Sequence, residues 1–369
     1  MANKKLKVGN VPNLRFSEFV EEWKRLTIGN ILTIGSGRDY KHLSAGAIPV
    51  YGTGGYMVSV NAYLHDGESV CIGRKGTINK PLYLNEKFWT VDTLFYTHSF
   101  KKVLPKFVYN IFEQVNWLKY SEASGVPSLS KTIIEQIEVN IPEINEQQKI
   151  ASFLSLIDER IQTQNKIIRE LNVLKTNTAK SIFSQDLRFK DDNGNDYHKW
   201  EVKKIKDVGK LSVGGDLNKL DYQKEKSEKY TYPIYANGEG SGLYGYSASF
   251  QYPENCVTVS GRGNLGTANV RFEKFCAIVR LIVIYPHFDI HPKYLQEIIN
   301  TINFAIESTG VPQLTVPQIS DYLITIPCFE EQTKIADFLL SIDSKIDIEN
   351  HLLQKLEEQK KFLLYQMFV

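Results

Sequence analysis

The feature that most constrains the fold of this 369-residue chain is an internal repeat. The segment I-P-E-I-N-E-Q-Q-K-I-A-S-F-L, which begins at Ile141, returns as I-P-C-F-E-E-Q-T-K-I-A-D-F-L at Ile326. The two copies align without a gap from Ser124/Thr309 to Phe183/Phe368, and 21 of these 60 paired positions are identical. A repeat of this length predicts two copies of one structural unit.

Both copies have the sequence pattern of a long helix without proline or glycine. Apolar residues recur with 4-3-4 spacing, which is typical of a coiled-coil seam. The expected seam residues are Ile150, Leu154, Ile157, Ile161, Ile168 and Leu171 in the first copy, and Ile335, Leu339, Ile342, Ile346, Leu353 and Leu356 in the second. Each seam has a polar gap, at Gln164 and at Glu349. Because a helix with one bare apolar stripe is rarely stable alone, we expect the two copies to pair.

The repeat extends upstream of the helices. An L-R-F segment, at Leu14–Phe16 and at Leu187–Phe189, precedes Trp23 and Trp200. The two tryptophans are closer together along the chain than the two helix starts are, so the second half carries eight additional residues in its loops. Between tryptophan and helix, short apolar runs such as Cys256–Val259 end in glycine turns, which is typical of strands.

These patterns predict an α+β fold in which two globular domains are separated by an antiparallel two-helix coiled coil with a pseudo-two-fold axis. The helices must run antiparallel because the first leaves one domain and enters the other. The chain then returns close to its start at Val369. The expected divisions are an N-terminal segment (1–22), a first domain (23–144), a long helix (145–185), a connector (186–199), a second domain (200–329) and a second long helix (330–369).

Composition sets broad limits on location and chemistry. The formal net charge of +2 neither requires nor excludes nucleic acid, and the four cysteines have no paired spacing, which indicates reduced thiols. The N-terminus lacks an apolar signal core and no 18-residue apolar run exists. We therefore expect a cytoplasmic protein.

No motif predicts catalysis. The chain has no phosphate loop, no F-x-G-x-G cofactor loop and no N-P-P-[FY] methyltransferase motif, and its seven histidines form no metal or triad pattern. Glu358-Gln-Lys360 has the E-x-K shape of a nuclease motif but lacks the upstream acidic partner. We predict neither a catalytic site nor a metal site.

The glycine turns are the better candidates for function. G-R-K-G-T at Gly73 and G-R-G-N-L-G-T at Gly261 pair closely approaching backbone with an arginine, the usual reader of guanine edges and a common phosphate contact. The same letters equally suit a hairpin turn with solvated charges. For the Tyr51 and Tyr235 loops, packing of the tyrosine in a core is favoured, and for the two Gly-Val-Pro loops a structural turn is favoured. The full set of candidate DNA-binding residues is Arg38, Lys41, Tyr51, Thr53, Arg74, Lys75, Thr77, Ser128, Lys219, Tyr235, Asn237, Arg262, Asn264, Thr267 and Gln313.

Six residues near the helix starts are candidate partner contacts: Glu146, Gln147, Phe153, Glu331, Gln332 and Phe338. For the glutamates, attraction to the positive end of the helix dipole is a sufficient alternative reason. The two phenylalanines lie beside the seam and need another surface, from the local domain or from another protein.

The repeated L-R-F…W, the glycine turns, G-V-P-x-L and E-Q-x-K-I-A-x-F-L followed by a long helix together resemble the specificity subunit of type I restriction-modification systems. The resemblance covers essentially the whole chain. It implies that each domain reads one half of a bipartite, asymmetric site on double-stranded DNA, and that the paired helices set the spacer and dock two methylation subunits. It also implies a non-enzymatic chain that binds no cofactor itself, with S-adenosylmethionine, ATP and Mg on partner subunits, including restriction and translocation subunits. The alternatives are the recognition part of a self-contained restriction-methylation enzyme and a coiled-coil scaffold that does not bind DNA.

Overall fold

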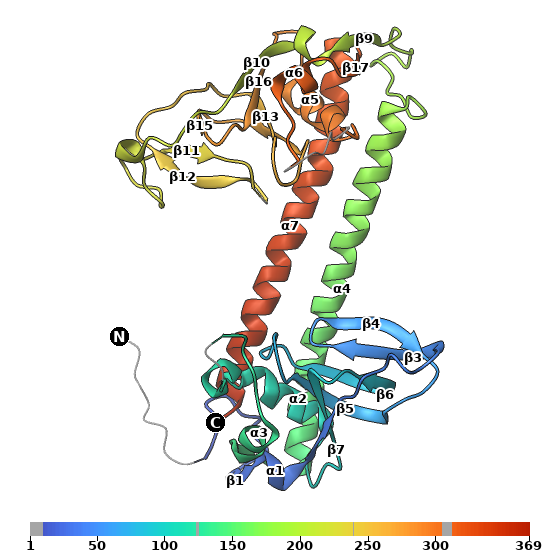
Figure 1. Cartoon of the computed structure of the whole chain (residues 1–369), viewed down its shortest axis with the longest axis vertical. Coiled ribbons are helices and arrows are strands. Elements are labelled where there is room, and N and C mark those ends of the chain that lie inside the picture. Colours follow the sequence, from blue (N-terminus) through green and yellow to red (C-terminus); the bar gives the residue numbers. More distant parts are fainter. Residues whose placement is uncertain (1–9, 123–124, 239, 305–311) are drawn as a thin grey trace. The chain divides into compact units, whose positions relative to one another are not determined.

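The computed structural model describes residues 10–122, 125–238, 240–304 and 312–369, and it divides into two units. Unit 1 comprises residues 1–165 and 351–369, and unit 2 comprises residues 166–350. The long helices α4 (Ile144–Phe183) and α7 (Phe329–Met367) each contribute one part to each unit (Figure 1). Their bounds lie within two residues of the expected ranges.

Unit 1 is built around a six-stranded sheet of order β2-β7-β5-β6-β3-β4 and a two-stranded sheet, β1-β8. Its elements before α4 are β1 (Lys24–Thr27), α1 (Ile28–Ile31), β2 (Thr33–Ser36), β3 (Ala45–Gly52), β4 (Gly55–Val60), β5 (His65–Gly73), β6 (Leu82–Thr90), β7 (Leu94–His98), α2 (Pro105–Gln114), η1 (Trp117–Tyr120), α3 (Lys131–Gln136) and β8 (Glu138–Ile141). Helix α2 begins with a proline, which the first helical position tolerates. It buries Phe107 in the core that also holds Val70 and Ile72 of β5.

Unit 2 repeats this plan with its main sheet in two parts, β10-β16-β13-β14 and β12-β11-β15, beside the two-stranded sheet β17-β9. Its elements between the long helices are β9 (Glu201–Lys204), η2 (Ile205–Asp207), β10 (Gly209–Val213), η3 (Lys219–Asp221), β11 (Tyr232–Tyr235), β12 (Leu243–Ser247), β13 (Cys256–Val259), β14 (Ala268–Arg271), β15 (Cys276–Ala277), β16 (Ile282–Pro286), α5 (Pro292–Ile299), α6 (Val316–Ser320) and β17 (Leu323–Ile326).

Strand register confirms the repeat. Tyr51 of β3 lies opposite Thr90 in a parallel pair, and Tyr235 of β11 lies opposite Ala277 in the equivalent parallel pair. Tyr235 follows Tyr51 by 184 positions, whereas Glu201 follows Lys24 by 177 positions, a difference of seven. Seven of the additional residues of unit 2 therefore lie between β9 and β11, the stretch that contains η3.

The two long helices pair antiparallel within each unit. In unit 1, Ile150 and Leu154 near the start of α4 share a core with Met367 at the end of α7. In unit 2, Ile182 near the end of α4 shares a core with Leu339 near the start of α7. The expected seam is thus partly domain core: Ile150, Leu154, Ile157, Ile335, Leu339, Ile346 and Leu356 are buried, and Ile161, Ile168, Leu171, Ile342 and Leu353 are half-buried. The polar-gap residues Gln164 and Glu349 are also buried.

The end of the chain returns to its N-terminal segment, as expected. The backbone N–H of Leu14 donates to the carbonyl of Gln366 (2.9 Å), and in unit 2 that of Leu187 donates to the carbonyl of Ser181 (3.0 Å), the counterpart of Gln366 in the repeat. Phe368 stacks on Phe107 with ring centroids 5.2 Å apart. The end of α7 therefore occupies in unit 1 the place that the end of α4 occupies in unit 2.

All four cysteines are free thiols, and Cys71, Cys256 and Cys276 are buried. Burial raises the pKa of Cys71 to about 12, which suits an inert core thiol. Within the described ranges, none of the helices carries an apolar stretch long enough to cross a bilayer.

Candidate nucleic-acid interface

The first glycine turn is held by backbone hydrogen bonds at the end of β5. The N–H of Arg74 donates to the carbonyl of Thr93 (2.7 Å), and the N–H of Leu129 donates to the carbonyl of Arg74 (2.8 Å). Lys75 forms a β-bridge with Ser128. The turn and the Gly-Val-Pro loop thus support one another, while the side chains of Arg74 and Lys75 remain exposed.

These residues line a groove of about 870 Å³. Arg74, Lys75 and Ser128 line it together with Lys131, the first residue of α3, and Asp92 and Glu122 add carboxylates. No sequence motif points to Lys131. Three cations beside a hydroxyl and two carboxylates can contact phosphate oxygens and base edges.

The second turn, in unit 2, is held by a matching hydrogen bond from the N–H of Leu314 to the carbonyl of Gly261 (2.9 Å). Nη2 of Arg262 donates to Oε1 of Gln313 (3.1 Å). The structure therefore brings Arg262 and Gln313 together. Of the second Gly-Val-Pro loop, Gly310 and Val311 lie outside the described residues.

Backbone hydrogen bonds show which residues of the two turns correspond to each other. This alignment is shifted by one position from the alignment that matches the Gly-Arg pairs in the sequence. Leu129 and Leu314, which are counterparts in the gap-free part of the repeat, bond to Arg74 and Gly261, so these two are counterparts as well. Gly76 lies two residues after Arg74, and Gly263 lies two residues after Gly261. Both glycines have positive φ, 92° and 69°. Lys75, rather than Arg74, is therefore the counterpart of Arg262, and each faces the residue after the loop proline.

Asn237 connects three loops of unit 2. Its Oδ1 accepts a hydrogen bond from the N–H of Gly261 (2.8 Å), and its Nδ2 donates to the carbonyl of Val279 (2.6 Å). The side-chain oxygen and the side-chain nitrogen of Asn237 thus both form hydrogen bonds inside the domain. Asn237 therefore holds the turn in position, and a direct contact of this residue with DNA stays a prediction.

The loop at Val279 adds a cation that the sequence pattern missed. Val279 and the exposed Arg280 both have positive φ, 53° and 58°. Positive φ is an outlier for a β-branched residue, and such strain gathers at functional sites. The carbonyl of Arg280 lies close to Gly261, so this loop is a neighbour of the second glycine turn.

Tyr51 and Tyr235 have matching structural roles. The hydroxyl of Tyr51 donates to Glu86 (2.7 Å), and that of Tyr235 donates to Glu273 (2.5 Å). Burial, reinforced by the neighbouring carboxylate, raises the pKa of each tyrosine to about 12. The guanidinium of Arg271 also lies 3.6 Å from the centre of the Tyr235 ring. Packing of these tyrosines, favoured from the sequence, agrees with this environment.

The other candidate DNA-binding residues stay predictions. Arg38, Lys41, Lys219, Asn264 and Thr267 are exposed, and Thr53 and Thr77 are half-buried. Arg38 lies beside β6, where its carbonyl accepts a hydrogen bond from Nε1 of Trp89 (2.8 Å). Lys219 lies on η3, inside the insertion of unit 2.

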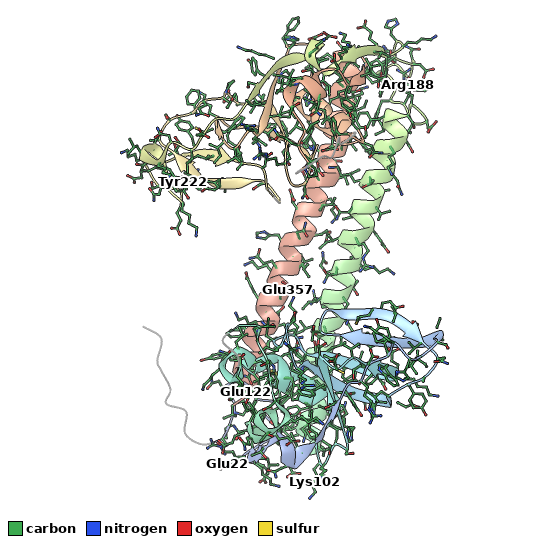
Figure 2. The ribbon with its side chains drawn as sticks, viewed as in Figure 1. Glu22, Lys102, Glu122, Arg188, Tyr222 and Glu357 are labelled. Carbon is green, nitrogen blue, oxygen red and sulfur yellow. The ribbon has the colours of Figure 1, made fainter. Side chains whose placement is uncertain are left out.

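The two glutamates at the helix starts are buried ionic anchors, which corrects their expected role as partner contacts. Glu146 accepts hydrogen bonds from Arg15 (2.7 and 2.8 Å) and from Nε1 of Trp23 (3.3 Å). In unit 2, Arg188, labelled in Figure 2, and Trp200 donate to Glu331 at 2.8 and 2.9 Å. The side chains of Glu146 and Glu331 are 2% and 0% exposed, so no partner can reach them.

The glutamines that follow are also internal, and their expected partner role is corrected in the same way. Gln147 donates to the carbonyls of Lys102 and Pro142 and accepts from the N–H of Leu104. Gln332 makes the equivalent three bonds, to the carbonyls of Asp289 and Pro327 and from the N–H of His291. Each glutamine connects the start of its helix to the loop before α2 or α5.

Phe153 and Phe338 are only partly covered by their own domains. Phe16 meets Phe153 edge-on at 6.0 Å, and Phe189 meets Phe338 at 5.7 Å. The two side chains remain 36% and 39% exposed. Of the six candidate partner contacts, these two are therefore still available.

The described part of the chain contains no group of three or more His, Cys, Asp or Glu arranged to hold a metal ion. The E-x-K residues of α7 serve other contacts. Glu358 is exposed and pairs with Lys355, whereas Lys360 is buried against Glu113 and Asp158. These pairings give the motif no common site.

Comparison with known proteins identifies the family. The sequence matches the type I restriction modification DNA specificity domain twice, over residues 20–173 and 197–358, and the chain belongs to this family. It is 26% identical over 318 residues to a Mycoplasma pneumoniae protein provisionally named as a type I specificity subunit, covering 81% of this chain and 82% of the relative. It is 25% identical over 338 residues to the specificity subunit of the MjaVIII type I restriction enzyme of Methanocaldococcus jannaschii, covering 82% and 76%.

A solved structure shares the fold. The crystal structure of the S subunit of a type I restriction-modification system from M. genitalium superposes with a TM-score of 0.66 at 16% identity. The match covers 97% of this chain and 99% of that chain. At this identity the likeness concerns the fold alone.

Proposed function

We propose that this chain is the DNA-recognition subunit of a type I restriction-modification complex, in which each globular domain reads one half of a bipartite, asymmetric site on double-stranded DNA. The observation that carries the proposal is the pair of equivalent turns. Lys75 beside Ser128 and Arg262 beside Gln313 occupy the same position in two matched domains of this family. The residues differ, so the two half-sites differ.

The long helices supply two partly equivalent apolar surfaces for a partner, in which Phe153 and Leu352 recur as Phe338 and Ile167 and Leu156 is replaced by Ser341. In unit 1 a groove of about 660 Å³ is lined by Phe153 and Leu156 of α4 and by Leu352 of α7. In unit 2, Phe338 and Ile167 occupy the positions that correspond to Phe153 and Leu352, and both are exposed. Exposed apolar patches of this kind mark protein interfaces. Their duplication supports docking of two copies of one partner, the methylation subunit.

On this proposal the chain itself is not an enzyme. S-adenosylmethionine, with adenine as the methylated base, belongs to the methylation subunits, and ATP and Mg belong to the restriction and translocation subunits. The helices set the number of unread base pairs between the half-sites. A scaffold that does not bind DNA would need the helices but not two elaborated, diverged domains.

The test is a methyl-transfer assay with labelled S-adenosylmethionine and genomic DNA of a strain that lacks the system. We expect the chain together with its methylation subunits to methylate this DNA, and the chain alone to transfer no methyl group. Transfer by the purified chain alone would support the self-contained enzyme. A complex that assembles but neither binds nor methylates DNA would support the scaffold.

A further inference from the structure

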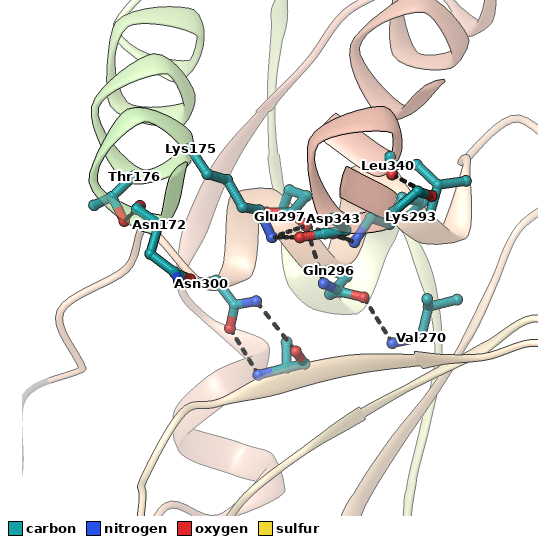
Figure 3. A network of polar contacts seen from close by, with 12 residues as sticks. Asn172, Lys175, Thr176, Val270, Lys293, Gln296, Glu297, Asn300, Leu340 and Asp343 are labelled. Atoms are coloured by element: carbon teal, nitrogen blue, oxygen red, sulfur yellow. Dashed lines mark hydrogen bonds and ion pairs between the residues drawn. The ribbon is translucent and has the colours of Figure 1, made fainter. Parts of the chain in front are cut away.

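A charge cluster with a buried part, Lys293 and Glu297, and a half-buried part, Lys175 and Asp343, connects three elements of unit 2 (Figure 3). The ammonium of Lys175 on α4 lies 2.6 Å from Asp343 on α7 and 3.1 Å from Glu297 on α5. Lys293 on α5 lies 2.6 Å from Glu297 and 2.7 Å from Asp343. The cluster thus joins the globular domain to both long helices.

Unit 1 has a similar cluster, in which the lysine and the aspartate are at equivalent positions of the repeat and the glutamate lies further along its helix. Lys360 on α7 lies 2.6 Å from Glu113 on α2 and 2.5 Å from Asp158 on α4. Lys175 and Lys360 are counterparts in the gap-free part of the repeat, as are Asp158 and Asp343. In each unit the lysine comes from one long helix and the aspartate from the other.

The two clusters differ in the residues that α2 and α5 supply. In unit 1 the residue four positions before the glutamate is Tyr109, whose hydroxyl donates to Glu113 at 3.0 Å, whereas in unit 2 it is Lys293. Unit 2 therefore pairs two lysines with two carboxylates, whereas unit 1 has one lysine. In unit 1, Oε2 of Glu113 is buried without a hydrogen-bond partner among the described residues. Burial raises the pKa of Glu113 above its ordinary value.

A chain of hydrogen bonds leads from the unit 2 cluster to the recognition turn. Nε2 of Gln296 donates to Glu297 (3.0 Å), and Oε1 of Gln296 accepts from the N–H of Val270 on β14 (2.9 Å). The neighbouring Asn300 holds Ala268, the first residue of β14, by two hydrogen bonds. Because β14 directly follows the turn 261–267, the cluster fixes this turn relative to the helices as well as the domain.

Buried ion pairs add little net stability because desolvation of the charges opposes their attraction. Their best-attested use is to specify one geometry among several. An apolar contact would allow α5 to slide on the helices, whereas one ammonium with three donors holds two carboxylates at defined positions.

We propose that Lys175 and Lys360 are positioning residues that fix the orientation of each recognition domain on the long helices, and thereby the spacer length that the complex accepts. This inference rests on the proposed function. Neither lysine contacts DNA. Unit 2, with its complete set of donors, holds its domain more firmly than unit 1 does.

The experiment uses the full chain with its methylation subunits and three DNA duplexes that carry both half-sites separated by the cognate spacer, one base pair less or one more. Methyl transfer to each duplex is measured for the wild type, Lys175→Met, Lys175→Arg and the control Lys166→Met. Lys166 is on the same helix but is 72% exposed. We expect Lys175→Met to raise the relative methylation of the two non-cognate duplexes about tenfold, which corresponds to about 1.4 kcal/mol of lost discrimination. Lys175→Arg, which keeps the charge, should restore most of it, and Lys166→Met should behave as wild type.

The inference is overturned if Lys175→Met keeps the wild-type proportions, or if it loses activity on all three duplexes by the same factor. If circular dichroism shows that this variant does not fold, Tyr109→Lys decides, because it adds the missing donor to unit 1. Tyr109→Lys should lower methylation of the non-cognate duplexes, and unchanged proportions overturn the inference. A wild-type complex that methylates none of the duplexes contradicts the proposed function instead.

Discussion

Glu331→Ala should destabilise unit 2 because it removes the carboxylate acceptor of a half-buried arginine and of a buried indole N–H. Glu331 is 0% exposed and Arg188 is 25% exposed. Removing one partner of a buried ion pair costs about 3–5 kcal/mol. Because Arg188 can regain some water, we expect the lower end, about 3 kcal/mol. For a unit of this size each kcal/mol lowers the melting temperature by about 2–4 °C, so the expected shift is about 6–12 °C.

The assay is differential scanning calorimetry combined with hydrogen exchange of peptides from each unit, which assigns the loss to unit 2. Glu330→Ala is the matched control because Glu330 is the exposed neighbour in the same first helical turn. The prediction is refuted if the free energies of unfolding of the two variants differ by less than about 0.5 kcal/mol, which is the ordinary range of a surface substitution. A stable Glu331→Ala that fails to bind methylation subunits would restore the glutamate as a partner contact.

Three further predictions follow from the structure. First, acid should act with opposite signs at Glu113 and Asp343. Burial raises the pKa of Glu113, so unit 1 should gain stability through this group as pH falls from 7 toward the ordinary carboxyl pKa of about 4.3, and Glu113→Gln should abolish that gain in calorimetric melts. For Asp343, burial alone would raise the pKa, but hydrogen bonds from Lys175 and Lys293 outweigh burial and lower the pKa. The stability that Asp343 adds to unit 2 should therefore disappear as pH falls below about 3.9. The Asp343→Asn variant should lack this contribution at every pH. Second, Lys75→Ala and Arg262→Ala should each relax discrimination in a different half-site, by about 1–3 kcal/mol if the contact is to a base edge, as measured by binding to duplexes with single substitutions; equal weakening on all sequences would identify a phosphate contact, and no change would leave a structural turn. Third, four residues inserted after Glu170 should lengthen α4 by about 6 Å and the spacer by about one to two base pairs. Two inserted residues should instead rotate the seam by about 200° and prevent assembly. An unchanged spacer in an active four-residue variant would mean that the length of the helix does not set the spacer.

The long helices and the repeat could be predicted because their signals are local. The apolar spacing of 4-3-4 and the gap-free alignment of the two copies are read directly from the letters. The β13 strand was likewise indicated by an apolar run that ends at a glycine turn. Antiparallel pairing followed from connectivity alone.

The roles of Glu146 and Glu331 could not be predicted in the same way. A glutamate in the first helical turn has the same letters whether it faces a partner or a buried arginine. The groups that decide the matter for Glu146 are Arg15 of the N-terminal segment and Trp23 at the start of the first domain, and both lie more than 120 residues earlier in the chain. Only the folded chain shows that they meet.

The register of the recognition turns was missed for a different reason. Gly-Arg occurs in both turns, and matching these letters aligns Arg74 with Arg262. Backbone hydrogen bonds place Lys75 there instead. Similarly, no motif marks Arg280 or Lys131, because their positions depend on the path of a loop and on the start of a short helix.

The most direct test of the account is sequencing of modified bases in the genome of a cell that expresses this chain with its methylation subunits. The account predicts methylated adenines in one motif, made of two different short sequences separated by a fixed number of unread base pairs. Exchange of residues 200–329 for the matching domain of a relative should change one of the two sequences and leave the other. A single continuous motif, or a motif in which both halves change together, would contradict the claim that two separate domains each read one half-site.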